Sequence, residues 1–225
     1  MKGVGLRHPA ASLRRQPQPR LRGKRVLLRP LAPSDWEAWR EVRLYNEGWL
    51  VPWEPRRSPA LPDPTRDRHA YEARCSARER ERATDHAHPF GLFLEADPNR
   101  PDRSGPVLIG EVNLNNVARG ALQSATIGYW VDQRHAGNGY VAEGVVVAMK
   151  YAFEQLHLHR LEICIVPRNR NSRRVMEKLG VREEGVAVRY LEIAGTWEDH
   201  VRYGFTAEEW EARRAELTAA WLQAP

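Results

Sequence analysis

The chain has 225 residues, of which 42% are hydrophobic and 28% are charged, a composition typical of a soluble globular protein. Its length favours one domain with a substantial core over two small ones. No apolar run reaches the roughly 18–20 residues needed to cross a membrane, and the N-terminus lacks the apolar stretch of a secretory signal. The two cysteines, Cys75 and Cys164, are too few for a disulfide framework, so we expect a cytoplasmic protein.

The positive charge is concentrated at the N-terminus. The net charge is +6, but residues 1–25 contribute +8 and no acid, so the remaining 200 residues carry −2. Because residues 1–23 are also rich in proline and poor in apolar side chains, we expect a disordered basic arm there and one domain over residues 24–222. The arm could attract RNA weakly, or could be a passive extension or a mis-assigned start.

The first part of the chain predicts a short helical region followed by antiparallel strands. In order we expect a strand at 25–31, a helix beginning at 33–35, an irregular segment at 45–55, a proline-rich loop at 55–64 and a charged helix at 65–83. Strand-like runs follow at 90–96, 107–114 and 125–131. Their connections are too short for helical crossovers, which predicts an antiparallel meander.

After residue 131 the pattern changes to alternating helices and strands. Val141, Val145 and Ala152 mark one apolar face of a helix, and residues 159–166 form a buried strand. A helix between two strands implies a parallel crossover. The remaining expected elements are a helix at 171–179 ended by Gly180, strands at 186–193 and 200–205 around a Gly195 turn, and a last helix capped by Thr206 and Glu209.

The stretch DQRHAGNGYVAEGV, residues 132–145, lies where a strand becomes a helix. Exposed N–H groups and the positive end of a helix dipole make an anion site there, and glycine lets a ligand approach closely. A tight turn that merely needs two glycines is the alternative. No Gly-Lys-Ser/Thr follows, which excludes a P-loop. A dinucleotide fingerprint, Gly137, Gly139 and Ala142, is disfavoured because antiparallel strands precede it and no acid ends the next strand.

The spacing Arg134-x-x-Gly137-x-Gly139 resembles the R/Q-x-x-G-x-G/A signature of the GCN5-related N-acetyltransferases, the GNAT superfamily. Roughly residues 24–205 are similar to its RimJ/RimL-type branch, whose enzymes acetylate N-terminal amines of ribosomal proteins. The similar stretches are IGYWVDQRHAGNGYVAEGV, YAFEQLHLHRLE, VPRNRNSRRVMEKLGVREEG and GTWEDHVRYGF. The resemblance implies an α/β (α+β) fold: a mixed, largely antiparallel central sheet with splayed central strands, flanked by helices.

The resemblance also implies a donor site for acetyl-CoA. Its residues would be Trp130, Val131, Arg134, His135, Ala136, Gly137, Asn138, Gly139, Tyr140, Asn169 and Ser172. Asn169 would contact the pantetheine arm and Ser172 would assist the leaving thiolate, although both residues commonly serve as plain helix caps. Many relatives place a tyrosine acid four residues after this serine; this chain has Met176 there, which favours Ser172.

The expected acceptor is a primary amine, in particular the N-terminal α-amine of a ribosomal protein that begins with alanine. Such an amine has a pKa of about 7.7–8.0, against about 10.4 for lysine, and needs only weak help to lose a proton. Glu111 and Glu192 are the candidate bases, although either could simply be solvated. Acceptor contacts are expected from the 186–197 hairpin and from residues 45–55, with Tyr45, Trp49 and Trp53 in the latter.

Other functions remain open at this point. The chain could acetylate a small amine or an antibiotic, or be a non-catalytic acyl-CoA-binding module. No metal is expected, because His135, His157, His159 and His200 lack ligand spacing. We expect a monomer or a homodimer without membrane contact.

Overall fold

The computed structural model of the chain describes residues 18–95 and 105–222. The strands are β1 (Leu21–Arg22), β2 (Val26–Arg29), β3 (His88–Leu94), β4 (Val107–Ala118), β5 (Ser124–Val131), β6 (Arg160–Ile165), β7 (Arg182–Ile193) and β8 (Thr196–Thr206). The α-helices are α1 (Trp36–Tyr45), α2 (Glu47–Leu50), α3 (Arg68–Ala83), α4 (Tyr140–Glu154), α5 (Arg170–Leu179) and α6 (Ala207–Trp221). Short 3₁₀ turns are η1 (Pro33–Asp35), η2 (Val51–Trp53) and η3 (Gln133–His135).

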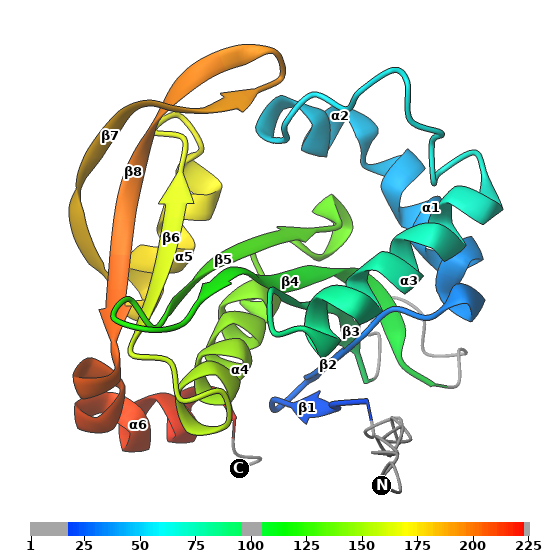
Figure 1. The fold of residues 1–225 in the computed structure, drawn as a ribbon. Helices are drawn as coiled ribbons and strands as arrows, with labels where there is room; N and C mark the ends of the chain where they lie inside the picture. Colours follow the sequence, from blue (N-terminus) through cyan, green and yellow to red (C-terminus); the bar gives the residue numbers. More distant parts are fainter. Residues whose placement is uncertain (1–17, 96–104, 223–225) are drawn as a thin grey trace, which may run out of the picture.

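One sheet organises the molecule, with strand order β1-β2-β3-β4-β5-β6-β8-β7 (Figure 1). Neighbouring strands are antiparallel except β5 and β6, which helix α4 connects as a parallel crossover. These two pair only where residues 124–126 face residues 160–162, and beyond that point they diverge. The rest of β5 stays bonded to β4 alone, as far as Val131. The prediction of a largely antiparallel sheet with splayed central strands is confirmed.

Helix α4 forms the centre of the larger core. Apart from Lys150 and Glu154, all of its residues are buried, so the expectation of a single apolar face is too narrow. A helix that is apolar all round is one packed on all sides. Its Gly144 lies so close to the sheet that a β carbon would stand 3.0 Å from Leu92 and 3.2 Å from Val112. Glycine therefore allows the helix to approach the strands closely.

The two faces of the sheet are covered by different helices. In β2, Val26 and Leu28 point into the core that contains α4, whereas Leu27 joins a separate cluster with Trp39 of α1 and Tyr71 of α3. This alternation follows from the two-residue period of a strand. Helices α4 and α6 therefore lie on one face and α1 and α3 on the other, as Figure 1 shows.

The expected boundary of the N-terminal arm is wrong by several residues. Strand β1 lies inside the range 1–23 and pairs with β2, and the Lys24 N–H donates to the Trp221 carbonyl oxygen at 3.3 Å. Residues 1–17, which carry most of the expected arm, lie outside the described residues. The prediction of arm disorder and RNA contact is therefore left to experiment.

Other local expectations have mixed outcomes. Residues 45–55 contain α2 and η2 and are thus more regular than predicted, and the strand expected at 107–114 continues to Ala118. The capping box of the last helix is confirmed, since the Thr206 side chain accepts from the Glu209 N–H and the Glu209 carboxylate accepts from the Thr206 N–H. Of the helices in the described ranges, none combines the length and apolar character that a membrane crossing requires.

Candidate active site

The turn between β5 and α4 presents backbone groups to open space. Gly137 and Gly139 have φ angles of 80° and 82°, a region that residues with a β carbon rarely adopt. A β carbon at Gly137 would meet no atom within 4 Å, so that side of the turn is open. Gly139 caps α4, whose first N–H groups have no partner within the helix. These unpaired donors and the helix dipole can bind an anion.

Arg134, expected either at a phosphate or at the rim of the donor site, does not line the cavity and instead pairs with neighbouring residues. Its guanidinium donates to Asp132 at 2.8 Å and lies 4.1 Å above the ring of Tyr45. Burial would raise the pKa of the Asp132 carboxyl, but the bonds from Arg134 hold it below its usual range. The Gln133 N–H donates to Asn46 at 2.8 Å, which ties the same turn to α1. Arg134 and Tyr45 thus stabilise each other by stacking, and neither residue lines the cavity.

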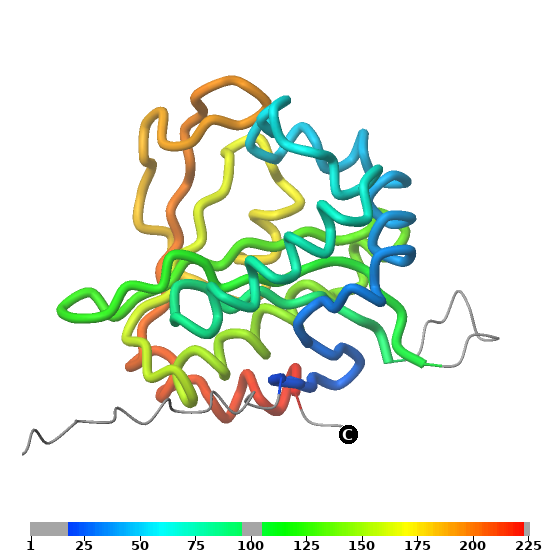
Figure 2. The backbone as a smooth tube through the Cα atoms, turned by 45° about the vertical axis from the view of Figure 1, so that its right-hand side comes forward, coloured from blue at the N-terminus to red at the C-terminus, as the bar shows by residue number. Residues whose placement is uncertain are grey.

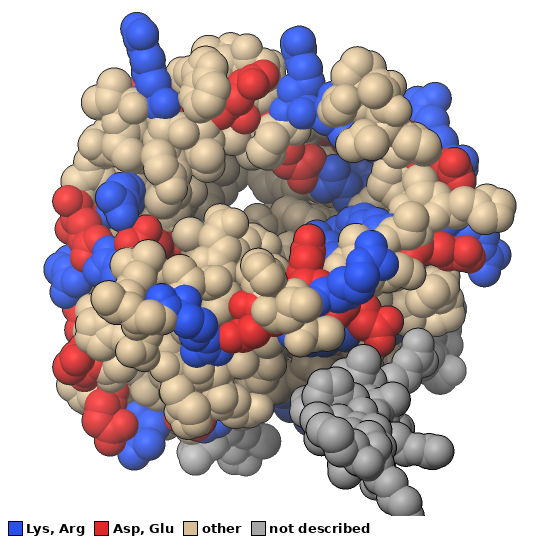
Figure 3. Space-filling model, viewed as in Figure 1, with Lys and Arg blue, Asp and Glu red and all other residues tan. Residues whose placement is uncertain are grey.

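A cavity of about 870 Å³ opens over the turn, and Figure 3 shows an opening in this face of the molecule. This volume suits a small-molecule or cofactor site. The sequence-predicted residues that line it are Trp49, Trp53, Trp130, Val131, His135, Ala136, Gly137, Gly139, Tyr140, Asn169 and Ser172. The sequence-predicted residues that do not line it are Tyr45, Glu111, Arg134, Asn138 and Glu192.

The divergence of β5 from β6 places the end of β5 along the cavity. At Gly110 of β4, a β carbon would stand 2.2 Å from the Trp130 carbonyl oxygen, so glycine is needed for β4 to approach β5. The Val131 carbonyl accepts a bond from the Trp49 indole at 3.1 Å. Beyond Thr126, no described residue of β5 pairs with β6. Backbone groups on that side are available to a ligand.

A serine at the start of α5 pairs with a tyrosine of β5. The Asn169 side chain accepts the Ser172 N–H at 3.1 Å and so caps the helix. The Ser172 hydroxyl donates to the Tyr129 hydroxyl at 2.9 Å, and the latter donates to the Ser172 carbonyl at 3.1 Å. Burial raises the pKa of Tyr129, which keeps its hydroxyl protonated. The structure therefore adds Tyr129, which the sequence analysis missed, to the predicted Ser172.

Glu111 lies beneath the cavity wall in a buried cluster. Its carboxylate, whose side chain is 1% exposed, accepts bonds from Trp39, Arg74 and Arg78, each at 2.8 Å. Burial alone would raise the pKa of this carboxyl, but the two arginines lower it to about 2. A general base works best with a pKa near the working pH, so this environment disfavours Glu111. Glu192, the other candidate, is exposed on β7.

Two segments that are distant in the sequence, residues 45–55 and the β7–β8 hairpin, meet above the cavity. We call this contact the roof. The Ala194 N–H, at the tip of the β7–β8 hairpin, donates to the Glu54 carbonyl at 2.9 Å. Arg168 lies 4.6 Å above the Trp53 ring and pairs with Glu198 of β8. Both ribbon views show the hairpin tip beside the segment of α2 (Figures 1 and 2). The two segments expected to contact the acceptor thus meet each other.

Several lining residues were missed from sequence. Asn171, Arg174, Val175 and Lys178 of α5 line the cavity. They recur every three or four residues from Asn171, so a helical projection of this segment would have placed them on one face. Glu54 had no such signal. Within residues 18–95 and 105–222, no three His, Cys, Asp or Glu side chains are grouped to hold a metal ion.

Comparison with known proteins agrees with this geometry. Residues 25–182 match the family described as acetyltransferase (GNAT) domain. The chain is 36% identical over 180 residues to the probable N-acetyltransferase YjcK of Bacillus subtilis, covering 80% of this chain and 93% of the relative. It is 32% identical over 200 residues to the [ribosomal protein uS5]-alanine N-acetyltransferase of Escherichia coli, covering 88% and 96%.

A solved structure also resembles the chain over most of its length. Mycobacterium smegmatis RimJ in complex with CoA-disulfide superposes with a TM-score of 0.76 at 32% identity, covering 90% of this chain and 93% of that one. The family match spans more than half of the chain, and these relatives are matched over nearly their whole length. The chain therefore belongs to the GNAT family and is an acetyl-CoA-dependent N-acetyltransferase of the RimJ/RimL type.

Proposed function

We propose that the acceptor is the N-terminal α-amine of a ribosomal protein with an alanine-type N-terminus. The observation that carries this proposal is the roofed cavity, which joins the glycine turn, the Ser172–Tyr129 pair and the tryptophans of residues 45–55 in one space. The similarity to the E. coli uS5-alanine enzyme, over 88% of this chain, supports the same acceptor class. A ribosomal acceptor would meet the enzyme in the cytoplasm.

Acetyl-CoA supplies the thioester that the amine attacks. The N–H groups of residues 137–142 bind the pyrophosphate at the start of α4, and the Lys178 ammonium, beside Gly139, adds positive charge. Backbone N–H groups on the free side of β5 stabilise the negative oxygen that develops on the carbonyl. The protein thus holds the reacting carbonyl between β5 and the start of α5.

Ser172 assists the departing thiolate. A rotation of both hydroxyls lets Ser172 donate to sulfur while Tyr129, which stays protonated, donates to the Ser172 oxygen. The serine then needs no charge of its own, because it acts as a hydrogen-bond donor. The acceptor amine is already partly neutral near pH 7, so a water molecule suffices to carry its proton away. We assign Glu111 a structural role.

The test is thiol release from acetyl-CoA with peptides that begin with the alanine-type N-termini of ribosomal proteins. Polyamines and aminoglycosides serve as parallel acceptors. We expect rapid turnover of one peptide and a loss of about 100-fold in kcat in Ser172→Ala, a typical size for one lost transition-state donor. Turnover of small amines alone would contradict the ribosomal acceptor. Binding of CoA without turnover of any acceptor would point to an acyl-CoA-binding module.

A further inference from the structure

The charges that line the cavity are unequally placed. Among the described residues around it, Glu54 is the only acid, whereas Arg174 and Lys178 are basic. A β carbon on Gly139 would stand 3.4 Å from the Lys178 ammonium, which places this cation at the glycine turn. Glu54 comes from the opposite segment, directly after η2. The cavity therefore has a basic end suited to phosphates and a separate acidic group.

Glu54 is held firmly by its surroundings. Its two carboxylate oxygens accept bonds from the Arg43 guanidinium at 2.6 and 2.7 Å. Arg43 is itself fixed between aromatic rings, 5.9 Å from Trp39 and 5.2 Å from Trp130. The backbone carbonyl of Glu54 holds the hairpin tip through the Ala194 N–H. The carboxylate is therefore positioned from two sides.

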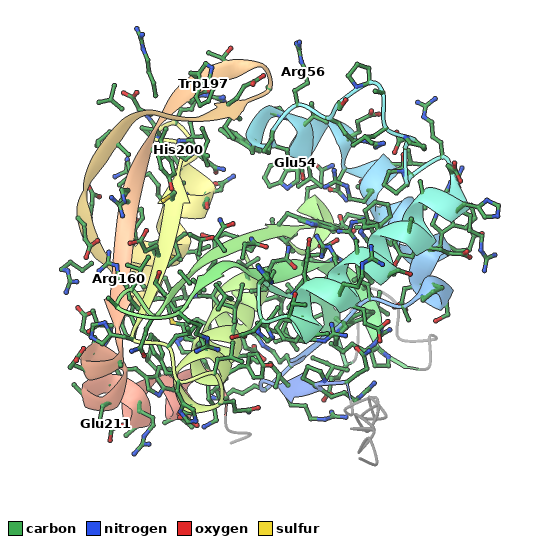
Figure 4. The ribbon with its side chains drawn as sticks, in the orientation of Figure 1. Glu54, Arg56, Arg160, Trp197, His200 and Glu211 are labelled. Atoms are coloured by element: carbon green, nitrogen blue, oxygen red, sulfur yellow. The ribbon has the colours of Figure 1, made fainter. Side chains whose placement is uncertain are left out.

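The Glu54 carboxylate can also accept further hydrogen bonds from groups in the cavity. The Glu54 side chain is 32% exposed and lines the opening, and Figure 4 shows it on the inner side of the segment that carries Arg56. Each carboxylate oxygen has two acceptor positions, and Arg43 occupies one on each. Two acceptor positions remain for N–H groups that enter the cavity. A primary amine or ammonium group supplies such donors.

We propose that Glu54 is the acceptor-binding residue that receives the amine to be acetylated, and this rests on the proposed function. The amine donates hydrogen bonds to the carboxylate, which directs the nitrogen lone pair toward the rest of the cavity. Arg43 offsets part of the negative charge, so that the acceptor is not trapped as a tight ion pair. Removing Arg43 would leave the Glu54 carboxylate with its full charge and without its partner. Arg43 is therefore a positioning residue that acts through Glu54.

Glu54→Gln tests the assignment, with Glu47→Gln as the matched control. Glu47 lies seven residues earlier on the same segment, is exposed, and does not line the cavity. Hydrogen bonds to a charged group are worth about 1.5–3 kcal/mol, which corresponds to a rise of roughly 10- to 150-fold in KM for the acceptor. The KM for acetyl-CoA should stay the same in both variants. Glu54→Asp, which keeps the charge, should recover part of the loss.

A ligand cycle separates recognition from structural damage. Binding of the acceptor peptide is compared by calorimetry with that of the same peptide whose terminal amine is replaced by hydrogen. The unsubstituted protein should prefer the amino peptide at least tenfold, and Glu54→Gln should bind the two peptides equally. A preference that survives in Glu54→Gln would overturn the assignment, whatever happens to overall affinity.

The same cycle distinguishes failure of this inference from failure of the proposed acceptor. If only a small amine is acetylated, the ribosomal acceptor is wrong, and the cycle is run with that amine and its hydroxyl analogue. Loss of discrimination in Glu54→Gln then still supports Glu54 as the amine site. If a peptide is acetylated but discrimination is unchanged, the acceptor stands and the role of Glu54 is refuted.

Discussion

The donor and acceptor sides of the cavity are built by different means. On the proposed donor side, the glycine turn and the starts of α4 and α5 line the cavity with backbone groups and a few side chains from short stretches of sequence. On the proposed acceptor side, the segment that carries Glu54 meets Arg168 and Ala194, which lie more than a hundred residues later in the sequence. A backbone site is visible as a motif, whereas a side-chain site depends on which segments meet in space. The proposed donor side is thus built by local structure, and the proposed acceptor side is built by tertiary packing.

The largest expected effect concerns Glu111, whose partner Trp39 also contacts Arg43 of the proposed acceptor side. Glu111→Gln leaves Arg74 and Arg78 facing a buried neutral amide, which should lower the free energy of unfolding by about 3–5 kcal/mol. Urea unfolding at pH 7 measures this. Glu47→Gln, at an exposed site, should change stability by no more than about 0.5 kcal/mol. A small effect of Glu111→Gln would show that the acceptor side does not depend on this cluster.

The same carboxylate predicts a pH dependence. The pKa of Glu111 is lowered in the folded protein from 4.5 to about 2, so the unfolded chain binds its proton first as the pH falls. The stabilisation is therefore complete above pH 4.5 and is lost progressively toward pH 2. Unfolding followed between pH 6 and pH 2.5 should show a steeper loss in the unsubstituted protein than in Glu111→Gln.

On the donor side, Gly139→Ala should act on acetyl-CoA alone. A β carbon at φ 82° costs about 1–2 kcal/mol and displaces the turn, so we expect KM for acetyl-CoA to rise about tenfold. Steady-state kinetics should show an unchanged KM for the acceptor. Gly48→Ala is the control, because Gly48 lines the cavity from α2, has no positive φ, and has no atom within 4 Å of its β-carbon position. An equal rise in the KM for acetyl-CoA in both variants would contradict the division of the cavity into a donor side and an acceptor side.

Between the two sides, Tyr129→Phe should lower kcat about tenfold by removing the partner of Ser172. The KM values should change little, because neither substrate is held by this bond. In the double variant with Ser172→Ala, kcat should match that of Ser172→Ala alone, since the two residues act as one unit. Additive losses would show that Tyr129 acts independently of the serine.

The smallest effect is expected at the roof. Arg168→Met removes the side chain that contacts the Trp53 ring and pairs with Glu198, and should raise KM for the acceptor a few-fold without changing KM for acetyl-CoA. Because this ion pair is exposed to solvent, about 0.5 M salt should mimic the substitution in the unsubstituted protein. Arg170→Met, two residues later on an exposed position, is the control. A change in both KM values would mean that the roof also shapes the donor side.

The features that the sequence predicts correctly are mostly those built by local structure. The glycine turn and the parallel crossover were predictable, because local backbone chemistry dictates them, and Ser172 lines the cavity as expected. Arg134 carries the signature spacing, yet its guanidinium is taken by Asp132 and Tyr45, and no sequence pattern reveals such a pairing. Glu54 was missed for the same reason.

Secondary structure shows a comparable limit. The composition of residues 1–23 suggested disorder, but β1 pairs with a strand and gains order from that neighbour. The burial of α4 on all sides likewise depends on α6 and on the sheet, which its own residues do not specify. Secondary-structure propensity describes a segment in isolation, whereas packing against other elements decides the structure and burial of that segment in the folded protein.

The bond between Lys24 and Trp221 has a practical consequence for anyone who attaches another protein to this one. It brings the first strands and the last helix together, and the Trp221 ring stands 3.6 Å from the position of a β carbon on Gly139. Cargo joined close to either of these residues would therefore sit beside the glycine turn, the proposed site of the pyrophosphate. A fluorophore placed there would report donor loading, whereas a bulky tag is better carried on the exposed turn at Gly120.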